Sequence, residues 1–324
     1  MPKLSMNHMA KKTIFVIGSS NTDMILRVPS IPRPGETVLG GRFASEPGGK
    51  GANQAVAAAR AGGRVVIMTS LGQDTFGDEY VRRFEMEGIE TGFVLRDAAA
   101  ASGVALIFVG ANGENSIGVA PGANEGLRPE HIDAARDALA AASILLIQLE
   151  IPVDTVAAAV QLAHAHGVRV IMNPAPAQPL SEALLAKISV LTPNETEAAL
   201  LSGIEVKDKA SAERAGRALL EKGVGEVVLT MGRGGCLHIT ADAVRHYPAF
   251  SVTAVDTTAA GDTFNGALAV ALAESRPIDN AIRFASAAAA LSVMQEGAQG
   301  GIPDRSAINN LLQTSTDEGG FRSQ

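Results

Sequence analysis

The chain has 324 residues, 46% of them hydrophobic and 19% charged, which is typical of a globular protein and unlike a disordered or coiled-coil chain. The 27 basic and 34 acidic residues give a formal net charge of -7, which argues against nucleic acid as a partner. A single cysteine, Cys236, excludes an internal disulfide and a multi-cysteine zinc site. No apolar stretch approaches the roughly 20 residues that span a bilayer, so we expect no membrane partner.

Apolar runs of buried-strand length alternate with Ala-rich helical runs along most of the chain. The expected strands cover 13–18, 64–70, 144–148, 168–173, 190–192 and 226–231, and the expected helices cover 52–61, 77–87, 129–141, 152–166, 195–202 and 211–222. This alternation predicts an α/β fold, a doubly wound, mostly parallel sheet flanked by helices. Ligands of such sheets bind beyond the carboxyl ends of the strands.

Two stretches interrupt this alternation. Residues 23–45 carry prolines among alternating apolar residues, and residues 102–119 have the pattern of two short strands around a turn. We expect both to form a small β-sheet lid over the strand ends, which would exclude water from a reaction site. The chain is therefore predicted to be a single domain over about 13–314, with loose termini at 1–12 and 315–324.

Small residues precede an Ala-rich helix in the segment 255–266. The backbone N–H groups of Ala259, Ala260 and Gly261 are expected to face open space at the positive end of a helix dipole, which suits an anion. Asp262 adds a negative charge there, which is explained if its carboxylate takes a proton from a hydroxyl that attacks a bound phosphoryl group. On this segment alone, a helix-capping role for Asp262 is an equal alternative.

A glycine-rich segment, 47–54, opens the first Ala-rich helix. Its glycines would let the backbone approach a small ligand, and Lys50 and Asn53 supply donors suited to hydroxyl groups. It lacks the spacing of a Walker A loop, and a purely structural turn is the alternative. Asn21 and Asp23 follow the first strand, where a ligand at the strand ends would be bound.

These motifs together resemble the PfkB-type sugar kinases, in the family's order and from about Thr13 to Leu312. The matching segments are Gly18-Ser-Ser-Asn-Thr-Asp23, Gly48-Gly-Lys-Gly-Ala-Asn53, Asn173-Pro-Ala-Pro176, Thr192-Pro-Asn-Glu195 and Asp256-Thr-Thr-Ala-Ala-Gly-Asp262. The resemblance implies ATP-dependent phosphorylation of D-ribose at O5, with Mg²⁺ and K⁺ as cofactors. It also favours a homodimer that pairs through the lid, and the single cysteine, Cys236, fits a reducing cytoplasm. The alternatives are a kinase for deoxyribose, fructose or 2-keto-3-deoxygluconate and a non-catalytic sugar sensor, against which the intact Asp262 argues.

The resemblance also implies a role for each matching residue. Asp262 would be the general base, and Ala259, Ala260 and Gly261 the anion hole. The implied sugar contacts are Asn21, Asp23, Gly49, Lys50, Gly51, Asn53, Glu150 and Asp262. The implied ATP contacts are Asn194, Thr230, Gly232, Gly234, Gly235, Gly261 and Ser286, with Glu197 holding Mg²⁺ through water. The implied K⁺ ligands are Asp256, Thr258, Ser292, Gln295, Gly297 and Gly301. The sequence departs from the family pattern at Gly301, where serine is common, and at Ser286, where histidine or asparagine often lies along the adenine.

Overall fold

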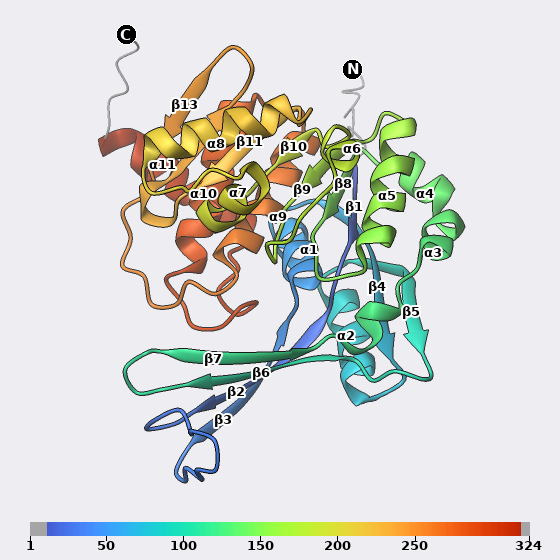
Figure 1. Cartoon of the computed structure of the whole chain (residues 1–324), viewed down its shortest axis with the longest axis vertical. Coiled ribbons are helices and arrows are strands. Elements are labelled where there is room, and N and C mark those ends of the chain that lie inside the picture. Colours follow the sequence, from blue (N-terminus) through green and yellow to red (C-terminus); the bar gives the residue numbers. More distant parts are fainter. Residues whose placement is uncertain (1–11, 319–324) are drawn as a thin grey trace, which may run out of the picture.

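The computed structural model describes residues 12–318 and contains a large sheet and a small one (Figure 1). The nine strands of the large sheet within these residues are, in spatial order, β13 (Val244–Tyr247), β12 (Cys236–Ile239), β11 (Glu226–Thr230), β10 (Val190–Leu191), β9 (Arg169–Met172), β8 (Ile144–Ile147), β1 (Thr13–Ile17), β4 (Arg64–Gly72) and β5 (Glu90–Asp97). Only the two pairings that involve β12 are antiparallel. The predicted doubly wound, mostly parallel sheet is confirmed.

Helices cover both faces of the large sheet, because its central strands are apolar on both sides. In β1, Ile14 and Val16 pack into one helical layer, and Phe15 and Ile17 pack into the other. The first layer holds α1 (Lys50–Arg60), α2 (Thr75–Met86), α9 (Ala260–Ala273), α10 (Ile278–Ser292) and α11 (Arg305–Glu318). The second holds α3 (Pro129–Ala134), α4 (Arg136–Ala140), α5 (Val153–Ala165), α6 (Glu182–Leu185), α7 (Glu195–Ser202) and α8 (Lys209–Glu221). No helix within residues 12–318 is both long and apolar enough to cross a membrane.

The small sheet projects away from the large one (Figure 1). Its strands lie in the order β3 (Arg42–Gly48), β2 (Asn21–Arg27), β6 (Gly103–Val109) and β7 (Asn115–Ala120). β2 and β6 are parallel, and the other two pairings are antiparallel. Tyr80 of α2 places its hydroxyl 2.8 Å from the Asn21 carbonyl and 2.5 Å from the Gly48 carbonyl, which anchors the base of this sheet to the large domain.

The structure differs from the sequence expectation at several elements, and β12, β13, α6 and α10 were not among those expected. The helix predicted over 129–141 divides at Ala135, whose N–H is shared between two preceding carbonyl oxygens. β5 was not predicted, because polar residues interrupt its pattern at this edge of the sheet. α11 continues to Glu318, four residues past the predicted end of the domain at 314, since no glycine or proline occurs before Gly319 to end the helix. The rest of the predicted loose termini, 1–11 and 319–324, lies outside the described residues.

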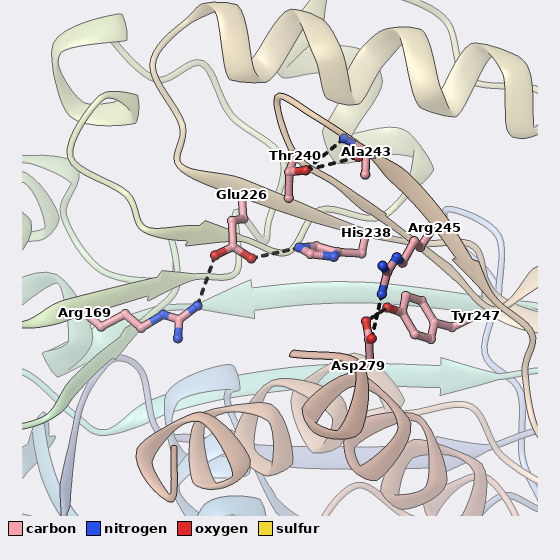
Figure 2. A network of polar contacts seen from close by, with 8 residues as sticks. All are labelled: Arg169, Glu226, His238, Thr240, Ala243, Arg245, Tyr247 and Asp279. Atoms are coloured by element: carbon pink, nitrogen blue, oxygen red, sulfur yellow. Dashed lines mark hydrogen bonds and ion pairs between the residues drawn. The ribbon is translucent and has the colours of Figure 1, made fainter. Parts of the chain in front are cut away.

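A polar network ties the antiparallel edge of the large sheet together (Figure 2). The Glu226 carboxylate lies 2.8 Å from Nε2 of the buried His238 and 3.3 Å from the Arg169 guanidinium. On β13, Arg245 and Tyr247 both donate hydrogen bonds to Asp279 of α10. The first contacts join β9, β11 and β12 to one another, and the second join β13 to α10. The edge that carries the loop 231–235 is therefore held in register by side chains as well as by the backbone.

Candidate functional site

The candidate site lies where the carboxyl ends of β1 and β8 meet the first turns of α1 and α9. The first turn of α1 approaches the end of β1 closely: Ala52 N donates to Ser19 O at 2.8 Å, and a Cβ on Gly51 would lie 2.5 Å from the carbonyl carbon of Gly18. Gly49 has φ of 85°, and a Cβ there would lie 2.6 Å from Asn21 N. The glycines therefore serve close backbone approach, which brings the start of α1 against the start of β2.

Asp262 lies in the first turn of α9 and is buried. Its two carboxylate oxygens accept hydrogen bonds from Asn53 Nδ2 and Gln54 Nε2, each at 3.0 Å. Burial raises the pKa of this carboxyl, against the charge of Lys50 and the two amide donors. The carboxylate thus faces α1, and a buried carboxylate of this kind is suited to accept a proton.

The predicted anion site lies at the N-terminus of α9. Ala259 precedes the helix in the left-handed conformation, with φ of 57° and ψ of 14°. A Cβ on the exposed Gly261 would meet no atom within 4 Å, so the space beside this residue is open. The expectation for Ala260 needs correction, because its N–H donates to Thr257 O at 3.3 Å rather than facing open space. The left-handed turn at Ala259 closes this long hydrogen bond.

Several carboxylates surround Lys50, the first residue of α1. The Glu150 carboxylate accepts hydrogen bonds from Ser19 Oγ at 2.5 Å and from Lys50 N at 2.9 Å. Burial, then Glu150, Glu46 and Asp262, raise the pKa of Asp23 to about 7, against Lys50. Burial lowers the pKa of the Lys50 ammonium, but the surrounding carboxylates outweigh it and the pKa is raised. The cluster therefore combines one cation with an excess of acceptors for ligand hydroxyls.

On the other side of Asp262, Asn194 caps α7. Its Oδ1 accepts from Glu197 N at 2.8 Å, while Glu197 Oε2 accepts from Asn194 N at 2.9 Å. The two residues thus form a reciprocal capping box at the start of α7. Burial raises the pKa of Glu197, and Lys50 and Asp262 also influence it, which places Glu197 beside the carboxylate cluster. A capping pair at this position leaves Asn194 at the rim of the site.

The loop expected along the nucleotide lies next to Asn194. Thr230 forms a parallel bridge with Asn194, and Thr230 N donates to Pro193 O at 2.9 Å. The residues that follow form a short 3₁₀ turn, Gly232–Gly234, closed by Gly235 at φ of 82°. Ser286 lies on α10, where its hydroxyl contacts the buried Cys236 thiol. Three of the predicted nucleotide segments, Asn194, the loop 230–235 and Ser286, thus lie next to one another.

The predicted cation ligands lie on two adjacent loops. The Asp256 carboxylate accepts from Thr258 N at 2.9 Å, Thr258 Oγ1 at 2.6 Å and Gly297 N at 3.1 Å. A Cβ on Gly301 would lie 2.5 Å from Ser292 O and 3.4 Å from Gly297 O, so these two carbonyl oxygens converge on that glycine. Gln295 is exposed in the same loop. The structure therefore gathers hard oxygen atoms here.

Sequence reasoning missed a set of buried polar residues behind Asp262. Gln54 Nε2 donates to Asn173 Oδ1 at 3.1 Å as well as to Asp262, and Asn173 Nδ2 donates to Thr192 O at 3.2 Å. Asn265 Oδ1 accepts from Thr192 Oγ1 at 2.6 Å, and Asn265 Nδ2 donates to Gly261 O at 2.9 Å. A signal was available, since Gln54 and Asn265 interrupt otherwise apolar helical faces, and a buried amide requires partners.

Comparison with known proteins gives consistent matches over nearly the whole chain. The model of the pfkB family carbohydrate kinases matches residues 11–305. A ribokinase of Haemophilus influenzae is 44% identical over 303 residues, covering 94% of this chain and 99% of the relative. A deoxyribokinase of Salmonella typhimurium is 40% identical over 92% of this chain and 98% of its own length. The structure of an Arabidopsis thaliana ribokinase with ribose and ATP is 30% identical, with a TM-score of 0.89 over 94% of this chain and 99% of that one.

Proposed function

Because the chain belongs to the pfkB family of carbohydrate kinases, we propose that it transfers the γ-phosphoryl group of ATP to the 5-hydroxyl of D-ribose. The observation that carries this proposal is the buried Asp262 carboxylate at the N-terminus of α9, whose charge interacts with Lys50 and Glu150 and with Glu197 of the capping pair. A hydroxyl acceptor and a phosphoryl donor would meet at this point. The N-terminus of a helix favours the negative charge of the donor.

Asp262 acts as the general base. Its carboxylate takes the proton of the sugar hydroxyl as the hydroxyl oxygen attacks the γ-phosphorus, and the bond from that phosphorus to the oxygen of the leaving ADP breaks. Backbone N–H groups at Ala259 and Gly261, together with the dipole of α9, stabilise charge on the transferred group.

The carboxylate cluster binds the sugar and discriminates against sugars that carry a negative charge. Asn21, Asp23, Lys50, Asn53 and Glu150 contact the hydroxyl groups, and Gly49 and Gly51 provide close backbone approach. Four carboxylates, Asp23, Glu46, Glu150 and Asp262, outnumber the one ammonium. This excess favours a neutral polyol over a sugar acid, because a further carboxylate would be repelled. D-ribose is therefore a better candidate than 2-keto-3-deoxygluconate.

ATP binds along the opposite border of the site. Asn194 lies near the phosphates, the loop of Thr230, Gly232, Gly234 and Gly235 follows the nucleotide, and Ser286 approaches its base. Within residues 12–318, no group of three or more His, Cys, Asp and Glu is placed to hold a metal ion. This fits Mg²⁺ held by phosphates and water with Glu197 as a single carboxylate, because Mg²⁺ keeps several waters. When bound, Mg²⁺ neutralises phosphate charge.

The loops around Gly301 fit a monovalent cation. Burial raises the pKa of Asp256, but hydrogen bonds from Thr258 and Gly297 and the charge of Arg27 outweigh it, so the pKa is lowered and the carboxylate stays ionised. The proposed K⁺ ligands are oxygen atoms of Asp256, Thr258, Ser292, Gln295, Gly297 and Gly301. When bound, K⁺ supplies positive charge near the anion site.

The small sheet acts as a lid and as the interface of a homodimer. The chain forms a single domain over about 13–314 and functions in the cytoplasm. Apolar side chains line both of its faces: cross-strand register places Ile25 and Ile117 on the face of Asp23, and Leu26 and Phe43 on the other. Phe43 is 66% and Ile117 55% exposed. A second small sheet would cover these side chains and the free edges. The buried lone cysteine, Cys236, suits a reducing compartment.

Replacement of Asp262 tests the catalytic assignment. We expect Asp262→Asn to lower kcat by about a thousandfold or more, while D-ribose affinity measured by calorimetry changes by less than about tenfold. Asp154→Asn, which alters an exposed carboxylate in the first turn of α5, is the matched control and retains full activity. Near-normal turnover in the Asp262 variant would refute the assignment of Asp262 as the general base.

A substrate panel tests the choice of sugar. The panel contains D-ribose, deoxyribose, fructose and 2-keto-3-deoxygluconate, each assayed with and without K⁺. We expect D-ribose to have the highest kcat/KM and the sugar acid the lowest. A higher value for any other sugar would refute ribose as the preferred substrate, and binding of sugar without turnover would identify a sensor.

A further inference from the structure

Two consecutive amide side chains of α1 bind both oxygens of the Asp262 carboxylate. Asn53 Nδ2 lies 3.0 Å from Oδ2, and Gln54 Nε2 lies 3.0 Å from Oδ1. Gln54 is fully buried, and its nitrogen also donates to Asn173 Oδ1 at 3.1 Å. Both oxygens of the carboxylate are therefore held by amide donors from α1.

A second amide stands behind each of these donors. Gln148 Nε2 donates to Gln54 Oε1 at 2.6 Å, and Gln299 Nε2 donates to Asn53 Oδ1 at 3.1 Å. These contacts determine which way each amide faces. If the Gln54 amide were turned over, its oxygen would face the Asp262 carboxylate and Asn173 Oδ1, and its nitrogen would face the nitrogen of Gln148. Both chains of amides therefore point their donors at Asp262.

The far end of one chain agrees with this direction. Gln148 Oε1 is buried and accepts no hydrogen bond within the described part of the chain. When every amide donates toward Asp262, the oxygen of the last amide receives no hydrogen bond from another amide. In this chain of amides that oxygen is Gln148 Oε1. Gly18 makes room for it, because a Cβ there would lie 2.1 Å from Gln148 Oε1. The outer amide thus has the same donor direction as the inner one.

We propose that Gln54, oriented by Gln148, and Gln299, acting through Asn53, are positioning residues that hold Asp262 ionised and directed at the sugar hydroxyl. The proposal rests on the function proposed above. Aligned hydrogen bonds polarise one another in a buried site, so each outer amide strengthens the inner donor. None of the three glutamines is required to touch sugar or nucleotide.

The charged groups facing Asp262 determine the expected pH dependence. They are Lys50 of α1, Glu150 after β8, Asp23 of β2 and Glu197 of α7. Burial raises the pKa of Asp262, while Lys50 and the two amide donors oppose this effect. Removal of one donor leaves the burial and the carboxylates in place. The pKa of Asp262 then rises further, and the base is protonated at a higher pH.

The test is the pH profile of kcat for variants of the amide chains. We expect Gln54→Met, which keeps the side-chain length and removes the donor, to move the acidic limb upward by about one pH unit. The KM for D-ribose should change by less than about twofold, because the sugar contacts stay in place. Gln148→Met and Gln299→Met should move the limb in the same direction by a smaller amount.

A matched control separates positioning from general loss of packing. Thr155→Val removes a buried hydrogen bond, from Thr155 Oγ1 to Leu127 O at 2.8 Å, away from Asp262. It should lower thermal stability and leave the limb in place. If the wild-type chain phosphorylates D-ribose and the acidic limb of Gln54→Met lies at the same pH as that of the wild type, this inference is overturned and the proposed function stands. If Gln54→Met does not fold, an unmoved limb in both other variants overturns it. A wild-type chain that phosphorylates no sugar overturns the proposed function first.

Discussion

Replacement of Asp23 by asparagine should stabilise the sugar-free protein at alkaline pH. The pKa of this carboxyl is raised from 3.8 to about 7, first by burial and then by Glu150, Glu46 and Asp262. Between these two values the folded protein holds a proton that the unfolded chain has released, so the free energy of unfolding falls as pH rises. The full shift corresponds to an upper bound of about 4 kcal/mol above pH 7. Asp23→Asn abolishes this loss, because asparagine carries no charge.

Urea unfolding of the sugar-free protein, followed by circular dichroism, measures this effect. The excess stability of Asp23→Asn over wild type should grow by about 3 kcal/mol between pH 5 and pH 8. Asp242→Asn, which alters an exposed carboxylate between β12 and β13, should show no such growth. An equal difference at both pH values would refute the argument that ionisation of Asp23 costs stability. In the same variant the KM for D-ribose should rise by about tenfold, because a charged acceptor is lost.

Three further predictions concern other parts of the molecule. Asp256→Asn should reduce activation by K⁺, measured as the ratio of rates with and without KCl, because it removes the negative charge of a proposed ligand; an unchanged ratio would count against the cation site. Tyr80→Phe should lower unfolding free energy by about 1 to 2 kcal/mol and raise the KM for D-ribose, since it releases the base of the small sheet; an unaltered KM would separate this anchor from sugar binding. Glu226→Gln should cost about 1 kcal/mol at pH 7. The hydrogen bond from His238 and the charge of Arg169 lower the pKa of Glu226, so this cost should shrink as pH falls below 4.5 and should not grow.

The sequence by itself determined the main fold. Apolar runs of strand length and Ala-rich helices alternate clearly, because a sheet covered on both faces needs strands without polar positions. The elements without that pattern were missed or misplaced. β5 is an edge strand with polar residues, and the helix over 129–141 divides at Ala135 through a local change of hydrogen bonding.

The sequence also pointed to the residues proposed as the reactive centre, because Asp262 stands among small residues at the start of a helix and Lys50 among glycines. What surrounds these residues was decided by the tertiary structure. Gln54 contacts Asp262 across 208 positions of the chain, and no local pattern encodes such a contact. The raised pKa of Asp23 likewise arises from burial and from carboxylates on other elements. Motif residues are visible in sequence because backbone geometry constrains their neighbours, whereas the electrostatic environment exists only once distant segments have packed together.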